Sequence, residues 1–400
     1  MPIALLALTL SAFAIGTTEF VIVGLIPTVA TDLGVSVPSA GLLVSLYALG
    51  VAIGAPVLTA LTGKLPRKAL LLGLMALFTA GNLLAWKAPG YESLVLARIL
   101  TGLAHGVFFS IGSTIATGLV PKEKAASAIA IMFTGLTVAL VTGVPLGTFI
   151  GQHFGWRETF LAVSALGVIA FIGSAIFVPN NIRHTPPATL GQQLKVLAEP
   201  RLLLVYAKTA IGYGGSFIPF TFLASILTEV SGFSASAVGW VMLVYGISVA
   251  AGNIWGGKLA DRIGPIPALK IIFALLAAVL LLLTFTAPYK WLALVTVLLW
   301  GAVAFGNVPG LQVYVVKQAQ RYTPQAVDVA SGLNIAAFNL GIAGAAWAGG
   351  LIVTHLGVMH TPWIGALVVL VSLGLTQWSG VLDRRSGVPD LASTSAGAGH

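Results

Sequence analysis

Four ionisable side chains lie inside long apolar stretches of this sequence, where a charge is unexpected. Glu19 lies in the middle of the stretch from Ile3 to about Val29, and Arg98, His105 and Lys208 lie in two later stretches. Stretches of this length cross a bilayer. A charge buried in lipid is costly, and it is usually retained because it moves ions or substrate. These residues are therefore the first candidates for the chemistry of the protein.

The expected depths of Glu19 and Arg98 in the membrane are similar. If the chain starts on the inner side, Glu19 lies roughly 24 Å along its helix at about 1.5 Å per residue. Arg98 lies in a helix that starts on the outer side, roughly 8–10 Å from that surface. With a hydrocarbon core of about 30 Å, both residues fall in its outer half. His105 lies about two helical turns further along the same face as Arg98.

His105 and Lys208 each have a functional and a structural interpretation. His105 could relay a proton or hydrogen-bond a polar substrate, or it could be a neutral histidine bonded to a neighbouring helix. Lys208 lies close to the inner end of its stretch, so its long stem could carry the ammonium to the interface. Alternatively, the ammonium could face an inner cavity, where it would attract anionic groups or compete with protons.

Composition places these residues in a membrane protein that crosses the bilayer many times. The chain has 400 residues, of which 58% are hydrophobic and 8% charged, and its mean hydropathy is +1.00. Soluble domains carry about 25% charged residues. The net charge of +9 fits a positive-inside bias and does not require nucleic acid as a partner. The absence of cysteine excludes disulfides, thiolate chemistry and Cys-ligated metals.

The apolar pattern predicts an all-α protein with twelve transmembrane helices in two six-helix halves. Residues 1–178 form the N-terminal half, 179–201 a cytoplasmic linker, 202–385 the C-terminal half, and 386–400 a disordered tail rich in Ser, Ala and Gly. The predicted spans are 3–29, 39–61, 69–86, 93–119, 125–150, 158–178, 202–227, 237–256, 266–286, 291–315, 327–353 and 362–381.

The basic residues predict that both termini are cytoplasmic. With that orientation the inner joints hold 15 Lys and Arg residues and the outer joints hold 3, with Arg98 and Lys208 inside spans. The opposite orientation would invert this bias. The outer three are Lys87, Arg157 and Lys290.

The two halves resemble each other weakly, at an offset of roughly 200 residues. Gly63-Lys64-Leu65 after the second span corresponds to Gly257-Lys258-Leu259 after the eighth. His153-Phe154-Gly155 corresponds to His355-Leu356-Gly357, and Gly106 to Gly306. Two halves with six spans each, related in parallel, are typical of one large transporter architecture.

Four local patterns make the chain resemble a major facilitator superfamily transporter over nearly its whole length. The joint from Gly257 to Gly264 resembles the superfamily loop signature G-x-L-[AS]-D-[RK]-x-G, although the corresponding first-half joint at Gly63 lacks the aspartate. The fourth span resembles the pattern of an intramembrane arginine followed by glycines. Gly143 to Gly151 resembles the Gly-Pro motif of drug:proton antiporters with twelve spans. Thr17 to Phe20, with Gly155-Trp156-Arg157, resembles the sugar-efflux and arabinose-efflux-permease-like subgroup.

The resemblance implies roles for the residues in these patterns. The first and fourth spans of the superfamily adjoin and line the cavity, so we expect an ion pair between Glu19 and Arg98 that a proton could open, or else a permanent tie between two helices. In the fifth span the motif residues would form a hinge or seal, or simply pack closely; they are Gly143, Pro145, Gly147 and Gly151. Gly257, Asp261 and Arg262 would latch helix ends at the cytoplasmic face, or form a simple loop.

Further polar and aromatic residues inside the spans are candidates for lining a substrate cavity. Amides and aromatic faces would suit sugar hydroxyls or flat drugs, although each residue could instead serve packing between helices. Besides Lys208, the candidates are Tyr47, Tyr213, Tyr245, Asn307, Gln312, Asn334 and Asn339.

The motifs that are absent narrow the function. The sequence has no G-x-x-x-x-G-K-[ST], no H-E-x-x-H and no G-x-S-x-G, so we expect no ATP site, no metal, no cofactor and no enzyme. We therefore expect a monomeric exporter in a bacterial inner membrane that exchanges protons for a small molecule such as a sugar or drug. The alternatives are a proton symporter or facilitator for uptake and, from another class, a membrane-embedded enzyme or lipid-handling protein.

Overall fold

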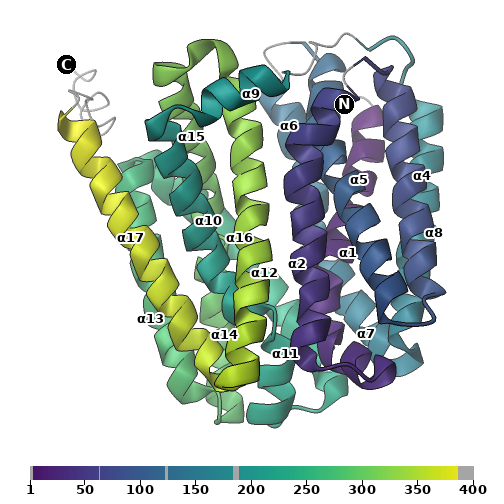
Figure 1. Cartoon of the computed structure of the whole chain (residues 1–400), viewed down its shortest axis with the longest axis vertical. Helices are drawn as coiled ribbons and strands as arrows, with labels where there is room; N and C mark the ends of the chain where they lie inside the picture. The colour runs from purple at the N-terminus through teal and green to yellow at the C-terminus, as the bar shows by residue number, and fades with distance from the viewer. Residues whose placement is uncertain (1–2, 63, 122–124, 183–188, 386–400) are drawn as a thin grey trace.

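The protein is all-helical in the part that the computed structural model describes, residues 3–62, 64–121, 125–182 and 189–385. Twelve helical segments in these residues are long and apolar enough to span a membrane. They form two bundles that stand side by side, with α1 to α8 in one and α10 to α17 in the other (Figure 1). The predicted fold class is confirmed. The predicted tail at 386–400 lies outside the described residues.

The N-terminal bundle is built from six spans, of which the second and fifth contain short π-helical segments at a proline or glycine. Its elements are α1 (Ile3–Leu33), α2 (Val37–Ile53), η1 (Gly54–Leu58), α3 (Thr59–Leu61), α4 (Arg67–Trp86), α5 (Tyr91–Gly118), α6 (Ala125–Val138), η3 (Ala139–Gly143), α7 (Val144–Phe154) and α8 (Trp156–Phe177). A π-helical turn absorbs a proline without ending the span, because it re-registers the backbone hydrogen bonds.

The C-terminal bundle has the same number of spans, and two of them are interrupted. Its elements are α10 (Pro200–Phe220), α11 (Leu223–Ser225), η4 (Ile226–Val230), α12 (Ala235–Ile263), α13 (Pro265–Thr286), α14 (Lys290–Ala304), α15 (Asn307–Tyr322), η5 (Pro324–Ala326), α16 (Val327–His355), η6 (Val358–His360) and α17 (Thr361–Arg385). The tenth span breaks between α14 and α15, where the Asn307 side-chain amide donates to the carbonyl of Ala304 at 2.8 Å.

The linker between the halves contains a helix that hydropathy does not predict. Helix α9 (Leu190–Leu197) starts at Thr189, whose side chain accepts from the backbone of Gln192, while the Gln192 side chain bonds back to Thr189. This reciprocal capping box is readable in the sequence. Helix α9 lies at the same end of the molecule as the start of α1 and the end of α17 (Figure 1). That end is the one to which the basic residues assign the cytoplasm.

The weak likeness between the halves also appears in the backbone. Gly155 and Gly357, which the sequence placed in corresponding positions, have positive φ angles of 102° and 99°. Each lies after a long helix and directly before the next span or its first turn. Only glycine adopts this conformation without strain. Equivalent tight turns therefore end the fifth and eleventh spans.

The halves meet along two lines of helices and at one end. Helix α2 packs against α16, and the η3–α7 segment packs against α12. At the end of the molecule opposite α9, α1 also contacts α11. One large buried apolar cluster draws residues from both halves, while two smaller clusters belong to one half each. Residues at the middle of α1 are thus buried at the boundary between the halves.

Candidate functional site

Glu19 lies at the middle of α1, buried from solvent with 8% of its surface exposed. Among the described residues, its Oε2 atom has no hydrogen-bond partner. The nearest cationic candidate is His105 of α5, whose Nδ1 lies 3.9 Å from Oε2. A buried carboxyl oxygen without a donor is unfavourable as an anion. The carboxyl group is therefore available for a proton or for a polar group of a ligand.

Arg98 does not form the expected ion pair with the Glu19 side chain. Its guanidinium donates instead to backbone carbonyls, from Nη1 to Thr18 at 2.6 Å and from Nη2 to Glu19 at 3.3 Å. Its Nε donates to the carbonyl of Leu43 on α2 at 3.3 Å. The two residues are neighbours, as the expectation of similar depth requires, but depth does not determine the direction of a side chain. Arg98 fastens α5 to the backbones of α1 and α2 beside the carboxyl group.

Tyr47 of α2 completes this group of residues. Its hydroxyl lies 3.0 Å from Nδ1 of His105, and the Arg98 guanidinium stacks 4.0 Å from its ring centre. Tyr47 and His105 are both buried. We call Glu19, Tyr47, Arg98 and His105 the Glu19 cluster. The imidazole of His105 lies between the carboxyl group of Glu19 and the phenol of Tyr47, three groups that can each carry a proton, whereas the arginine keeps its charge in proteins.

Aromatic side chains of the C-terminal half cover the neighbouring face. Phe20, which follows Glu19, lies 6.4 Å from Phe217 and 6.3 Å from Phe305 between ring centres. Tyr213 packs edge-on against Phe305 and Phe338. The aromatic wall comprises Phe20, Tyr213, Phe217, Phe220, Tyr245, Trp300, Phe305 and Phe338. Sequence reasoning named Tyr213 and Tyr245 but missed Phe20 and Phe305, although Phe20 adjoins the buried acid.

The amide candidates divide into a hydrogen-bonded pair and two partly unsatisfied residues. Asn334 accepts from Thr209 at 2.8 Å and donates to Gln312 at 3.0 Å, which ties α10, α15 and α16 together. Asn307 and Asn339 each donate within their own helix region, and the Oδ1 atom of each is buried without a partner. The structure therefore gives Asn334 and Gln312 an interhelical role. The Oδ1 atoms of Asn307 and Asn339 could each accept a hydrogen bond from a ligand.

Lys208 does not reach the interface, so the snorkelling interpretation is wrong. The residue is fully buried, and its Nζ lies 3.4 Å from the centre of the Tyr314 ring. Nζ has no hydrogen-bond partner within the described part of the chain. Helices α15 and α17 enclose this side of α10, because Tyr314 donates to Asp383 of α17 at 2.8 Å. The hydropathy pattern could not show this enclosure.

The glycines of the fifth span fit against α1 at regular intervals. A methyl group added at Gly143 would overlap the Thr17 hydroxyl, and one at Gly147 would lie 2.6 Å from a Val21 methyl. Gly151 faces Leu25 in the same way. On the other side, the Pro145 carbonyl faces Gly239 of α12, across the boundary between the halves. The motif residues thus pack tightly where both halves meet.

Gly143→Ala is expected to destabilise the protein by about 1–3 kcal/mol, because the added methyl overfills a packed contact. The matched control is Gly344→Ala in α16, where no atom lies within 4 Å of an added methyl. That variant should be as stable as the wild type or slightly more stable, since alanine favours a helix over glycine by up to about 1 kcal/mol. Thermal unfolding of both variants in one detergent measures the difference. Equal stability of the two variants would contradict this account of the motif.

The expected cytoplasmic latch is not formed in this structure. Asp261 and Arg262 are exposed in the last turn of α12, and neither takes part in an ion pair among the described residues. Gly257 lies near Pro309 of α15, and Gly264 ends the helix with a φ angle of 87°. The motif therefore serves here as a helix end that places two opposite charges in solvent.

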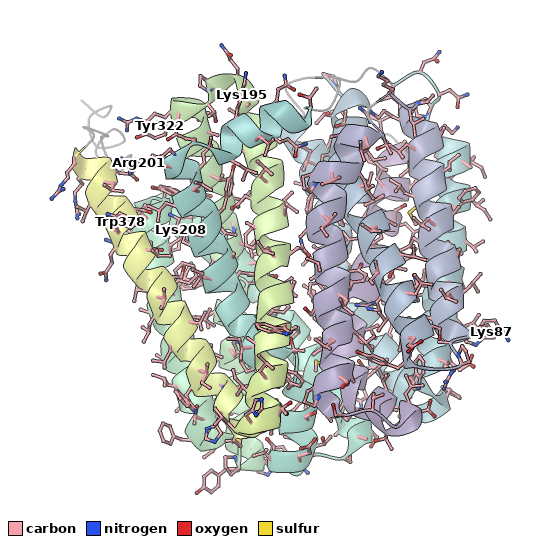
Figure 2. All side chains as sticks on the ribbon, viewed as in Figure 1. Lys87, Lys195, Arg201, Lys208, Tyr322 and Trp378 are labelled. Atoms are coloured by element: carbon pink, nitrogen blue, oxygen red, sulfur yellow. The ribbon has the colours of Figure 1, made fainter. Side chains whose placement is uncertain are left out.

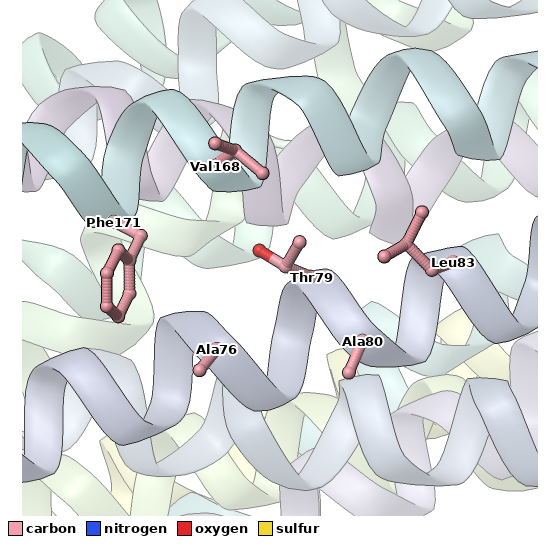
Figure 3. A pocket seen from close by; sticks show the side chains of 6 residues that line it. All are labelled: Ala76, Thr79, Ala80, Leu83, Val168 and Phe171. Atoms are coloured by element: carbon pink, nitrogen blue, oxygen red, sulfur yellow. The ribbon is translucent and has the colours of Figure 1, made fainter.

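Two surface depressions lie away from the Glu19 cluster. One is a shallow apolar depression between α4 and α8, lined by Ala76, Thr79, Ala80, Leu83, Val168 and Phe171 (Figure 3). Its lining residues include no ionisable side chain. The other lies between the halves near the ends of α1 and η4, and includes Thr28, Asp32 and Thr228.

Within residues 3–62, 64–121, 125–182 and 189–385, no group of three His, Asp or Glu residues could hold a metal.

Twelve membrane-crossing helices in two halves, with ionisable groups buried where the halves meet, define a membrane transporter. A sequence model of the Major Facilitator Superfamily matches residues 8–327. The chain belongs to this superfamily, and its family and fold are those of a transporter rather than an enzyme.

Curated relatives match over nearly the whole chain. An uncharacterized MFS-type transporter, YtbD of Bacillus subtilis, is 55% identical over 96% of both chains. The putative transporter AraJ of Escherichia coli is 32% identical over 89% of both. A chloramphenicol resistance protein of Streptomyces lividans is 35% identical and covers 93% of this chain and 95% of its own. The resemblance to sugar- and drug-efflux members of the superfamily is thereby confirmed.

A solved structure supports the fold independently. The bacterial homologue of the human lysosomal transporter Spinster, in an inward-facing and occupied conformation, matches with a TM-score of 0.74. The match covers 94% of this chain and 96% of that one at 16% sequence identity. At this identity the match concerns the fold alone.

Proposed function

We propose that the protein is a proton-coupled antiporter that exports small molecules, such as sugars or drugs, from bacterial cells. It acts by alternating access in the inner membrane, with both termini in the cytoplasm. The observation that carries this proposal is the Glu19 carboxyl group, which is buried at the boundary between the halves with one oxygen lacking a partner. Such a group favours either a proton or a polar ligand in the same place.

Competition at Glu19 provides the coupling. Protonation removes the charge of the carboxyl group, which lowers the cost of burying it between the halves. Substrate binding at the protonated carboxyl group displaces its proton and leaves the carboxylate beside the substrate, so proton and substrate cross in opposite directions. His105, at 3.9 Å, and Tyr47, bonded to His105, are placed to carry the proton to and from Glu19. Arg98 supports the site by holding the α1 backbone.

The surroundings of Glu19 suit an amphipathic substrate. The aromatic wall offers ring faces and edges through Phe20, Tyr213 and Phe305. Free amide acceptors at Asn307 and Asn339 could accept from hydroxyl or amide groups of a ligand. Since one relative is a chloramphenicol resistance protein, chloramphenicol, which has both an aromatic ring and hydroxyl groups, is a reasonable first probe. L-arabinose represents the sugar class.

Transport in proteoliposomes tests the direction and the coupling. Purified protein in vesicles with an acidic lumen is given labelled chloramphenicol or L-arabinose outside. We expect uptake of at least one probe, collapsing when a protonophore removes the pH gradient. Accumulation only with an alkaline lumen would indicate a symporter, and equilibration unaffected by the gradient would indicate a facilitator. Either result would overturn the antiporter proposal.

A further inference from the structure

The C-terminal half contains a second buried ionisable group that the proposed cycle does not use. Lys208 has no exposed surface, and no described residue offers its Nζ atom a hydrogen bond. Figure 2 places it inside the C-terminal half, below Arg201. The ring of Tyr314 lies directly beneath the ammonium, at 3.4 Å from Nζ to the ring centre. A protonated lysine is attracted to such a ring, whereas a neutral amine is not.

The carboxylate of Asp383, whose side chain bonds to Tyr314, is already balanced by other groups. Asp383 accepts from Tyr314 at 2.8 Å and from Gln318 at 3.1 Å, and Arg201 lies 3.5 Å from its Oδ1. Arg201 keeps its positive charge, so it neutralises Asp383. The proton on Lys208 therefore adds a further positive charge to a buried site. Loss of this proton would remove the unbalanced charge.

In the part of the chain that the structure describes, Lys208 forms no ion pair with a carboxylate. Helix α13 contributes Lys270, which approaches α17 near Gly380 and carries the same charge sign. Helix α16 contributes the amide of Asn334, which is bonded to Thr209. The Tyr314 ring on α15 contacts Nζ, and Asp383 on α17 accepts a hydrogen bond from Tyr314. The contact with the Tyr314 ring thus favours the charged form of Lys208, in addition to the attraction of Asp383, which Arg201 offsets.

The helix that Tyr314 belongs to is separated from the first part of its span by a break. The tenth span is interrupted between Ala304 and Asn307, so α15 is not rigidly continuous with α14. Phe305, at the interruption, packs against Phe20 beside Glu19. Helix α15 is connected to α10 and α17 through Tyr314 and Gln318. A change at Lys208 acts directly on one of these connections.

We propose that Lys208 is a second proton-binding site, which holds α15 against α10 through the Tyr314 ring when protonated and releases it when neutral. The proton leaves the Nζ atom for water at the cytoplasmic surface, near Asp383 in the last turns of α17. No bond other than N–H breaks. This proton-binding site is separate from the proposed antiport site at Glu19, and its protonation does not require a substrate.

The absence of cysteine makes a direct test possible, because one introduced thiol is the only one in the chain. Val315→Cys places the thiol beside Tyr314 at a position with no exposed surface. N-ethylmaleimide then reacts only when α15 moves away. Gln320→Cys, exposed on the same helix, is the matched control for the pH dependence of the thiol itself. The ratio of the two labelling rates reports the release of α15.

We expect this ratio to rise with pH by up to about tenfold per unit where Lys208 loses its proton, as for a single proton-binding group. Lys208→Met should remove the pH dependence. Lys208→Arg should hold the ratio at its low-pH value, because arginine stays charged and stacks on aromatic rings. Tyr314→Leu, which removes the ring, should behave like Lys208→Met.

A pH dependence that is unchanged in Lys208→Met or Lys208→Arg would overturn the proposal. If Lys208→Met does not fold, Lys208→Arg and Tyr314→Leu decide the question. Glu19→Gln in the Val315→Cys background should keep the pH dependence, so a failure of the Glu19 proposal and a failure of this one are separable.

Discussion

Replacing Glu19 with glutamine is expected to abolish proton release on substrate binding while leaving the protein folded. Glutamine has nearly the same shape, so the packing of Glu19 against α5 and the aromatic wall should persist. Its amide cannot release a proton. Purified wild-type protein mixed with chloramphenicol in weakly buffered solution should acidify the medium, and the variant should not.

The same substitution should remove accumulation against a gradient. If one proton is exchanged for one neutral substrate, each pH unit supports about tenfold accumulation, because one unit corresponds to about 1.4 kcal/mol. In vesicles that contain the Glu19→Gln variant, the substrate concentrations inside and outside should become equal at any pH gradient. Exchange of labelled for unlabelled substrate should continue, since it requires binding and alternation but no net proton movement.

A carboxylate outside the site provides the control. Glu92 is exposed in the first turn of α5, so Glu92→Gln changes the net charge by the same amount without altering the boundary between the halves. It should release protons and accumulate substrate like the wild type. Undiminished proton release from Glu19→Gln would show that another group carries the coupling proton. Glu19 would then be a structural residue.

The sequence predicted the helices well because a span needs apolar side chains in the hydrocarbon core, and hydropathy detects such side chains. Hydropathy could not show where a helix continues beyond the apolar stretch. The eighth span was expected to end near residue 256 and the tenth near 315, but α12 continues to Ile263 and α15 to Tyr322. The added turns are polar and charged, such as Lys258 and Asp261 in α12. Their helical structure continues that of the span, and hydrophobicity does not record it.

The sequence predicted which residues form the candidate site, but not which of their side chains contact one another. Depth along each helix brought Glu19, Arg98 and His105 to the same region, and the structure places them together. Rotation about the helix axis is decided by packing, which no local pattern records. Consequently Arg98 bonds to backbone carbonyls, and the Glu19 side chain faces His105 instead. For the same reason Asp383 and Tyr314, far apart in sequence, could not be recognised as neighbours of Lys208.

Replacing Arg98 with methionine is expected to destabilise the protein by about 3 kcal/mol or more, since charge-assisted hydrogen bonds contribute about 1.5–3 kcal/mol each. The Arg98 guanidinium donates to three carbonyls on two helices, and its side chain is fully buried. Methionine keeps much of the stem but none of the donors. Arg98→Lys should be intermediate, because an ammonium cannot reach three acceptors with the geometry of a guanidinium. Denaturant unfolding in detergent measures each loss.

Arg262→Met is the matched control, because Arg262 is exposed at the end of α12. Surface substitutions usually change stability by less than about 0.5 kcal/mol. A stability of Arg98→Met equal to that of Arg262→Met would contradict the role of Arg98 as a fastener of α1.

A double-mutant cycle distinguishes this role from the ion pair that depth alone indicated. If the Glu19 carboxylate and Arg98 were paired, neutralising both would be less harmful than the sum of the single changes, with a coupling of about 0.5–3 kcal/mol. Arg98 bonds to the backbone carbonyl of Glu19, and that bond remains in Glu19→Gln. We therefore expect the stability effects of Glu19→Gln and Arg98→Met to add within about 0.5 kcal/mol. A larger coupling would mean that the side chains pair in a state other than this one, and that opening of the pair belongs to the transport cycle.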